Sequence, residues 1–478
     1  MVVRQRTGLL LLMSVLCSTA AGNLAPRGTT PVRRSSSSQK RGGNRGHEEG
    51  LDAKPASSPG GSTAAASVDE LQPKRKKRIL MLISDTGGGH RASANALRDM
   101  MEELRPEEVD VKVVDIWTEY GSWPHNKMAA GYPWLCKHRF FWRLMYFASV
   151  NRFSEFQWYW LTRFQCGGKF KRCIEEYAPD LVVSLHPLCQ NLPLRNLKTL
   201  RREGKLGVDR KVPFATICTD LGGAHPSWFR SEVDVTFVAS DSVRRLARRR
   251  GVPKGKLIQH GLPVRRDFWR PSVSKERTKE QFAALGLQPH KKTVLIVGGG
   301  DGVGSLGAIV DAIASRVARD LPKGEVQVIA LCGKNKDLAR QLTAQSESSN
   351  NGAWDGVHVE VRGFTSEISA FMDVADVLVT KAGPGTIAEA AIRALPTLIS
   401  SFLPGQEAGN VKFVVDQGWG EFAPRPARIG KRVSAWLTDE KLLERMQTAA
   451  RAVAAPQATR LIAADCLRLM DAAHADLA

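Results

Sequence analysis

The fold of this chain is decided by residues 375–391, which read ADVLVTKAGPGTIAEAA. Residues 377–379 form a short apolar run, typical of a strand that is buried in a parallel sheet. The glycines and the proline at 383–385 break this run, and the residues from Thr386 onward predict a helix. A strand that passes through a glycine-rich turn into a helix is the repeating unit of α/β folds.

The turn in this unit is a candidate phosphate site. Backbone N–H groups and the positive end of the helix dipole converge at such a helix start. Glycine lets a ligand approach the backbone closely, and proline suits the first helical turn because it needs no N–H donor there. We therefore predict a nucleotide diphosphate site, and the alternative is an ordinary strand–helix turn without a ligand. Its candidate residues are Lys381, Gly383, Pro384, Gly385, Thr386 and, at the ribose, Glu389.

Similar units extend on both sides of this stretch. Buried strands are expected at 79–83, 111–116, 181–185, 214–218 and 235–238, and again at 293–297, 326–331, 357–361, 377–380 and 397–400. Alternating strands and helices imply a parallel sheet with helices on both faces. We predict two doubly wound, Rossmann-like domains with a cleft between them, at 74–270 and 285–445. The helical segment 446–478 would then be free to pack back on the first domain.

Polar residues recur at the strand ends of the first domain. An open α/β sheet builds its ligand crevice at these ends. A lone histidine is usually structural, but several in equivalent places favour a site. The candidates are His90, which follows Gly88 and Gly89, and then His186, Asp220, His225 and His260.

Residues 117–170 are rich in aromatic side chains. They hold six of the eleven tryptophans and four of the five tyrosines, interleaved with lysine and arginine. This mixture suits a membrane interface, where rings lie at the headgroup level and basic groups meet anionic lipid. A buried aromatic core is the alternative, and both stay open. If the region faces a membrane, Trp134 and Trp142, together with the later Trp228, would form its surface.

The first 73 residues read as a targeting leader and linker. Residues 1–47 hold eight Arg or Lys and no acid, with an apolar run at 8–17 that is too short to span a bilayer. A signal-like core before a Ser/Arg-rich tail suggests plastid import, and plain disorder is the alternative. Removing these charges lowers the net charge from +21 to +13, so the remainder is still basic. No nucleic-acid-binding motif accompanies that charge. The chain also has no CxxC pair, the pattern that would suggest a disulfide or zinc site.

Six ordered motifs carry a resemblance to a known family. They are residues 84–94 (SDTGGGHRASA), His186-Pro187, 259–265 (QHGLPVR), 298–300 (GGG), 381–390 (KAGPGTIAEA) and 404–410 (PGQEAGN). Together they resemble the monogalactosyldiacylglycerol synthases of plants and algae, which have the GT-B glycosyltransferase fold. The resemblance covers roughly residues 78–437.

The resemblance implies an inverting transfer of galactose from UDP-galactose to diacylglycerol at a plastid envelope membrane. The enzyme would attach peripherally, on one face, and anionic lipid would activate it. No other cofactor is expected, nucleic acid is not expected as a partner, and a homodimer stays open. A glucose or N-acetylglucosamine donor, a Rossmann oxidoreductase and a non-catalytic lipid-binding protein are the alternatives.

These implications assign roles to individual residues. No Asp-x-Asp pair occurs in the chain, so we expect backbone N–H groups rather than a metal to hold the diphosphate. His90 is the expected base, since a near-neutral imidazole suits proton abstraction, and Asp220 is either a rival base or the group that orients His90. The remaining donor candidates are Gly299, Gly300 and Gly302 at the diphosphate, Gly363 and Phe364 at the uracil, and Gln406 and Glu407 at the hexose.

Overall fold

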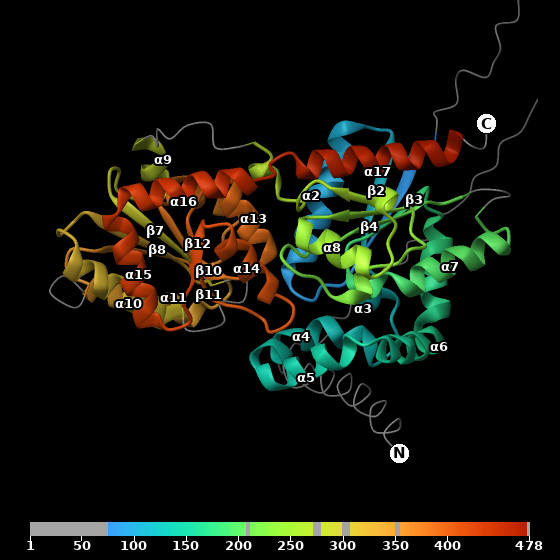
Figure 1. Cartoon of the computed structure of the whole chain (residues 1–478), viewed down its shortest axis with the longest axis horizontal. Coiled ribbons are helices and arrows are strands. Elements are labelled where there is room, and N and C mark those ends of the chain that lie inside the picture. Colours follow the sequence, from blue (N-terminus) through green and yellow to red (C-terminus); the bar gives the residue numbers. More distant parts are fainter. Residues whose placement is uncertain (1–74, 207–210, 271–278, 299–305, 349–353, 476–478) are drawn as a thin grey trace, which may run out of the picture. The chain divides into compact units, whose positions relative to one another are not determined.

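A computed structural model describes residues 75–206, 211–270, 279–298, 306–348 and 354–475 (Figure 1). The leader and Gly299, Gly300 and Gly302 lie outside these ranges. The described chain forms two six-stranded sheets, one after the other along the sequence. Every strand pairing in both sheets is parallel. The prediction of two doubly wound α/β halves is therefore confirmed.

The first sheet has the strand order β2-β1-β3-β4-β5-β6. Its strands are β1 (Lys77–Ile83), β2 (Val109–Asp115), β3 (Leu181–Ser184), β4 (Phe214–Ile217), β5 (Val235–Val238) and β6 (Leu257–Gln259). The chain runs from β1 outward to β2 and then returns to the other side of β1 at β3. The carboxyl ends of β1 and β3 therefore flank the topological switch point, where α/β proteins bind ligands.

Helices cover both faces of this sheet. On one face, α2 (Gly88–Leu104) lies beside the last helix, α17 (Ala458–Ala475) (Figure 1). Both helices share a buried apolar cluster with β1. On the other face, α6 (Arg152–Tyr177) and α7 (Asn191–Arg202) do the same. The remaining helices of this half are α3 (Ile116–Tyr120), α4 (Met128–Lys137), α5 (Arg139–Ser149) and α8 (Asp241–Arg249).

The second sheet has the order β12-β11-β10-β7-β8-β9. Its strands are β7 (Lys292–Val297), β8 (Val326–Leu331), β9 (His358–Arg362), β10 (Val377–Lys381), β11 (Thr397–Ser401) and β12 (Gly420–Phe422). Here the switch point lies between β7 and β10, so the turn after β10 is at the position where a ligand is expected.

Apolar helix faces bury this second sheet as well. Its helices are α9 (Lys279–Ala284), α10 (Leu306–Asp320), α11 (Lys336–Ser348), α12 (Ile368–Val374), α13 (Pro384–Ile392), α14 (Ala408–Asp416), α15 (Pro426–Thr438) and α16 (Glu440–Val453). One cluster joins β7 and β10 to α10 and α15. The other lies under α12 and α13 and includes Leu221, Leu262 and Val264 of the first half. The two halves therefore share apolar core.

Candidate active site

The loop after β1 delivers its histidine into the first turn of α2. Gly87 caps the helix with a φ of 81°, a backbone conformation that favours glycine. Gly88 and Gly89 are the first helical residues and His90 is the third. A Cβ atom added at Gly88 or Gly89 would meet no other atom within 4 Å. Packing within the protein therefore does not require these glycines, whereas the close approach of a ligand would.

The His90 ring is buried among polar partners from two other strand ends. Its Nδ1 and Thr219 Oγ1, after β4, are hydrogen-bonded at 2.9 Å. The His186 ring, after β3, stands edge-on at 4.6 Å between centroids, and its Nε2 is hydrogen-bonded to Thr86 Oγ1 at 2.9 Å. Burial lowers the pKa of His90 to about 4, although a hydrogen bond with the Leu185 backbone and the charge of Asp85 raise it in part. The imidazole is therefore neutral at pH 7 and holds a lone pair.

Asp220 is a second buried titratable group at this edge of the sheet. Trp228 Nε1 donates to its Oδ2 at 2.8 Å. Burial raises the pKa of Asp220 to about 7, the Trp228 hydrogen bond opposes this, and the Glu407 carboxylate adds to it. A carboxyl in this state is half protonated near neutral pH. Within the described part of the chain we find no direct hydrogen bond between Asp220 and His90.

Strand order explains which predicted residues come together. Since β1, β3 and β4 are adjacent, His90, His186 and Asp220 meet at their carboxyl ends. His260 follows β6, at the far edge of the sheet, and its Nε2 pairs with Asp465 of α17 at 2.7 Å. The His260 ring therefore contacts the last helix, and its place in the crevice stays a prediction.

The turn after β10 has the expected geometry. Gly383 caps α13 and Pro384 is its first residue, so the helix begins two residues earlier than Thr386. A Cβ atom added at Gly385 would meet nothing within 4 Å. The helix holds no acid in its first turn, which leaves its N–H groups and dipole suited to an anion.

Lys381 and Glu407 form an ion pair beside this turn. Lys381 Nζ donates to Glu407 Oε1 at 3.0 Å, and the backbone N–H of Leu403 donates to Oε2 at 2.8 Å. The Glu407 carboxylate is buried, whereas Gln406 is half-buried. In this structure Glu407 therefore holds its own loop against the turn.

Glu389 is buried in α13 and engaged on both carboxylate oxygens. Arg265 donates to Oε1 at 2.7 Å and to Oε2 at 2.6 Å. Burial raises the pKa of Glu389, and Arg265 opposes that shift. A ribose at Glu389 would have to share the carboxylate with Arg265 or displace it.

Two further donor candidates lie at some distance from this turn. Gly363 and Phe364 follow β9, the edge strand, which is three strands from β10. This separation is roughly 14 Å at the usual strand spacing. Phe364 is 70% exposed. Only the uracil end of an extended UDP-sugar would reach these residues.

Asn410, the third residue of α14, ties the two strand-end loops together. Gly222 N donates to its Oδ1 at 2.8 Å, and its Nδ2 donates to Ala382 O at 2.9 Å. A Cβ atom added at Gly222 would lie 1.9 Å from the carbonyl oxygen of Gly409, so only glycine permits this approach. The Asp220 loop and the turn that begins α13 therefore meet at one buried amide.

Two site residues escaped the sequence reasoning. Thr219, which immediately precedes Asp220, holds the His90 ring by a hydrogen bond. Tyr132 lies with its ring 3.5 Å from the Cβ position of Gly87. Burial raises the pKa of Tyr132 well above its ordinary value, and Cys136, Glu407 and Asp220 add to this. No local pattern marks Tyr132, because it was one of several aromatics in residues 117–170.

The aromatic side chains of this region are divided between a buried set and an exposed set. Trp142 is 4% exposed and Trp228 is fully buried, so the expectation that these two side chains form a surface is wrong. Trp134 is half-buried and stacks on His138. The exposed apolar side chains of α5 and α6 are Phe140, Phe141, Leu144, Phe147, Phe153, Phe156, Trp160 and Phe164. Their spacing in the sequence could have identified this exposed set, because side chains three or four residues apart lie on the same face of a helix.

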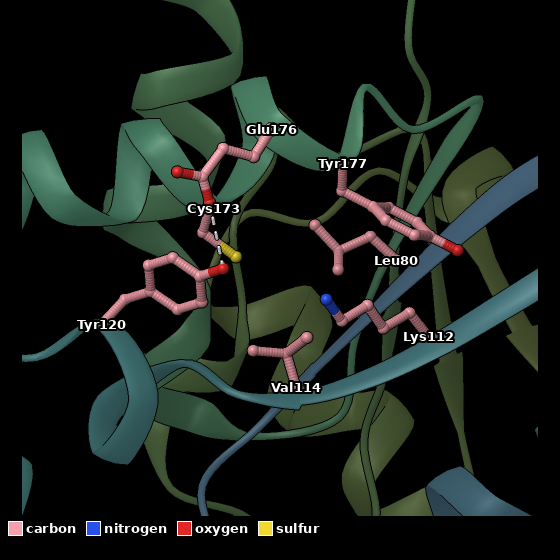
Figure 2. A pocket seen from close by; sticks show the side chains of 7 residues that line it. All are labelled: Leu80, Lys112, Val114, Tyr120, Cys173, Glu176 and Tyr177. Atoms are coloured by element: carbon pink, nitrogen blue, oxygen red, sulfur yellow. Dashed lines mark hydrogen bonds between the residues drawn. The ribbon is translucent and has the colours of Figure 1, made fainter. Parts of the chain in front are cut away.

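The first half has a separate hollow of about 80 Å³, and Figure 2 shows the side chains that line it. Its lining includes Lys112 of β2, Tyr120, and Glu176 of α6, and Tyr120 Oη donates to Glu176 Oε2 at 3.2 Å. Nucleotide sugars need several hundred Å³. None of the predicted site residues lines this hollow, and we give it no part in the chemistry.

Three wider features concern metal ligands, disulfides and membrane-spanning helices. Within residues 75–475, outside the gaps given above, no cluster of His, Cys, Asp and Glu has the makings of a metal site. No disulfide links the seven cysteines in the described ranges. Nor does any helix in those ranges have the length and apolar character needed to cross a bilayer.

Comparison with known families matches both halves of the chain. A model described as monogalactosyldiacylglycerol (MGDG) synthase matches residues 90–264. A model described as glycosyltransferase family 28 C-terminal domain matches residues 293–461. The first match includes His90 and Asp220, and the second includes the turn before α13.

Curated plant proteins are similar over most of the chain. The monogalactosyldiacylglycerol synthase of Spinacia oleracea, named as chloroplastic, is 37% identical over 77% of this chain and 68% of its own length. Monogalactosyldiacylglycerol synthase 1 of Arabidopsis thaliana, also named as chloroplastic, is 35% identical over 84% and 73%. The chain spans 65% of the length of a probable synthase from Nicotiana tabacum, at 36% identity.

Solved structures share the fold. The crystal structure of MurG from Acinetobacter baumannii has a TM-score of 0.52 at 13% identity, covering 82% of this chain and 99% of MurG. The MnaA–UDP co-structure from S. aureus has a TM-score of 0.51 at 12% identity, covering 81% and 94%. The expected GT-B arrangement of two Rossmann-like halves is confirmed.

Proposed function

This chain belongs to the monogalactosyldiacylglycerol synthase family, and from that premise we propose that it transfers galactose from UDP-galactose to 1,2-diacylglycerol. The acceptor oxygen attacks the anomeric carbon, the bond from that carbon to the UDP phosphate oxygen breaks, and the configuration inverts. One observation carries this proposal. Asn410 joins the loop of Asp220 to the turn before α13, so acid–base groups and an anion site share one location.

The donor diphosphate would lie at the N-terminus of α13. Backbone N–H groups of Gly385 and Thr386, together with the helix dipole, would receive the charge of the leaving UDP. Lys381 is half-exposed and paired with Glu407, so it could turn toward the diphosphate. Glu389 would take the ribose, and Gln406 and Glu407 the hexose hydroxyls. No metal is needed in this arrangement, and turnover should persist in excess EDTA.

His90 would accept the proton of the acceptor hydroxyl. Burial lowers the pKa of His90 to about 4, which disfavours the imidazolium. A bound diphosphate brings negative charge that raises the pKa of every nearby group. This change moves His90 toward the range that suits a base. It moves Asp220, whose pKa starts at about 7, into the protonated state. We therefore assign the base to His90 and a hydrogen-bonding role to Asp220.

Diacylglycerol would arrive from a membrane that contacts α5 and α6. Phe153, Phe156, Trp160 and Phe164 recur at helical spacing on α6 and are exposed. Exposed arginines lie among them, which suits anionic lipid as a partner and activator. Together with the chloroplastic relatives, this face supports peripheral attachment to a plastid envelope membrane. Sedimentation of the full chain tests whether it forms a homodimer.

The donor is tested by direct competition. The full chain is assayed with diacylglycerol in mixed micelles and radiolabelled UDP-galactose, UDP-glucose or UDP-N-acetylglucosamine. We expect galactose transfer to dominate and to give a product with inverted anomeric configuration. Preferential transfer of another sugar would replace the donor in this proposal, and lipid binding without any transfer would favour a non-catalytic protein.

The membrane face is tested at its most exposed side chain. Phe164, 92% exposed, should insert into the lipid headgroup region. Phe164→Ser should therefore weaken partitioning onto vesicles that contain anionic lipid by roughly tenfold, because one phenylalanine loses its apolar burial. Vesicle flotation measures this effect. Leu461→Ser is the control, since Leu461 is 43% exposed but lies on α17. If both variants float equally well, α6 is not part of the face that contacts the membrane.

A further inference from the structure

Helix α5 has two apolar faces with different neighbours. Phe140, Leu144 and Phe147 lie three or four residues apart and are exposed. Trp142 lies on another face and is 4% exposed. Its indole is buried together with Leu135 and packs near Tyr146 and Leu403. Leu403 comes from the second half, so the inner face of α5 contacts a loop of the donor-binding half.

This contact includes a directed hydrogen bond. Trp142 Nε1 donates to the carbonyl oxygen of Pro404 at 2.9 Å. The next residue, Gly405, has a φ of 86°, and a Cβ atom there would lie 2.3 Å from the Tyr146 ring. The backbone at 404–405 therefore lies directly against α5, at a distance that only glycine permits.

The same loop carries the residues assigned to the hexose. Gln406 and Glu407 follow Gly405 immediately. Glu407 Oε2 accepts from Leu403 N, and its Oε1 accepts from Lys381 beside the diphosphate turn. Displacing Pro404 would shift Leu403 and Gly405 on either side of it. The position of the Glu407 carboxylate therefore depends on the contact between α5 and Pro404.

We propose that Trp142 is a positioning residue for the donor sugar, which holds the loop of Gln406 and Glu407 from the membrane-binding side of the protein. Trp142 does not touch lipid in this arrangement and does not touch the reacting atoms. Since the outer face of α5 meets the membrane and its inner face holds the donor loop, one helix serves both substrates. This inference rests on the proposed function for the identity of the donor.

The test compares two buried tryptophans. Trp142→Phe keeps an aromatic ring and removes the N–H that holds Pro404. Trp436→Phe is the matched control, because Trp436 is fully buried in α15 and its Nε1 has no hydrogen-bond partner within the described residues. For Trp142→Phe we expect the KM for UDP-galactose to rise by about 3- to 10-fold, the effect of one hydrogen bond. The KM for diacylglycerol and the vesicle flotation should not change. Trp436→Phe should leave all three values unchanged.

A second variant reaches the same loop by another route. Gly405→Ala should push the loop away from Tyr146 and raise the donor KM in the same way. Calorimetric titration with UDP-galactose, without lipid, shows whether the loss is in donor binding. A donor KM within twofold of wild type in both variants would overturn the inference, as would a change in flotation with Trp142→Phe. If the wild type uses another UDP-sugar, the proposed donor fails, and the same KM comparison with that sugar decides the role of Trp142.

Discussion

Replacing His90 by alanine is expected to lower turnover by roughly 10²- to 10⁴-fold, the usual contribution of a general base. The KM for UDP-galactose should change little, because the ring lies at the end of β1 and the donor turn belongs to the second half. Burial of the ring and its contact with Thr219 add a structural role, so the thermal midpoint must be measured as well. Initial rates with saturating substrates give the turnover.

Two further variants separate chemistry from folding. His90→Asn keeps a polar group near Thr219 but cannot accept the proton, so it should be as inactive as His90→Ala. Added imidazole should restore part of the turnover of His90→Ala if the loss is that of a base. His358→Ala is the control, since His358 is half-buried on β9, at the far edge of the second sheet. Near-normal turnover of His90→Ala would contradict the assignment.

Much of the fold could be predicted because buried parallel strands are strongly apolar. The ten expected strands all occur, and none of their ends differs from the expected position by more than two residues. β6 and β12 were missed, since each is three residues long and presents no apolar run. The turn before α13 was readable because glycine and proline determine the local backbone there.

The candidate site was only partly readable from the chain. Residues at strand ends are easy to find, but strand order decides which of them meet. His90 and His186 come together because β1 and β3 pair, whereas His260 follows an edge strand. Local sequence contains neither fact. Contacts between the halves, such as those of Asn410, depend on tertiary packing, and no local sequence pattern predicts them.

The aromatic region shows a different limit. Composition indicated a membrane face, but it did not separate the inner side chains from the outer ones. Trp142 and Trp228 are buried, and each indole N–H donates to an acceptor inside the protein, Pro404 O and Asp220 Oδ2 respectively. Three phenylalanines of α6, at positions 153, 156 and 164, lie on its exposed face together with Trp160, whereas Phe170 of the same helix is buried.

Asp220→Asn is expected to stabilise the protein at alkaline pH. Burial raises the pKa of Asp220 from 3.8 to about 7, so the folded state binds this proton more tightly than the unfolded state does. The wild type therefore loses stability as pH rises from about 4 to 7, and above 7 the whole cost is present. At roughly 1.4 kcal/mol per pKa unit, that cost is on the order of 4 kcal/mol. Chemical denaturation at pH 5 and pH 8.5 measures it.

The asparagine variant also decides between the two candidate bases. An amide keeps an oxygen that can accept from Trp228 and carries no charge at any pH, so its stability gain should be large at pH 8.5 and small at low pH. Asp416→Asn, on an exposed carboxylate that pairs with Lys412, should show no comparable gain. If Asp220 is protonated beside the donor, Asp220→Asn should keep turnover within about tenfold of wild type at pH 7. A loss of 10²-fold or more, with the stability gain still present, would make Asp220 the base and leave His90 a binding role.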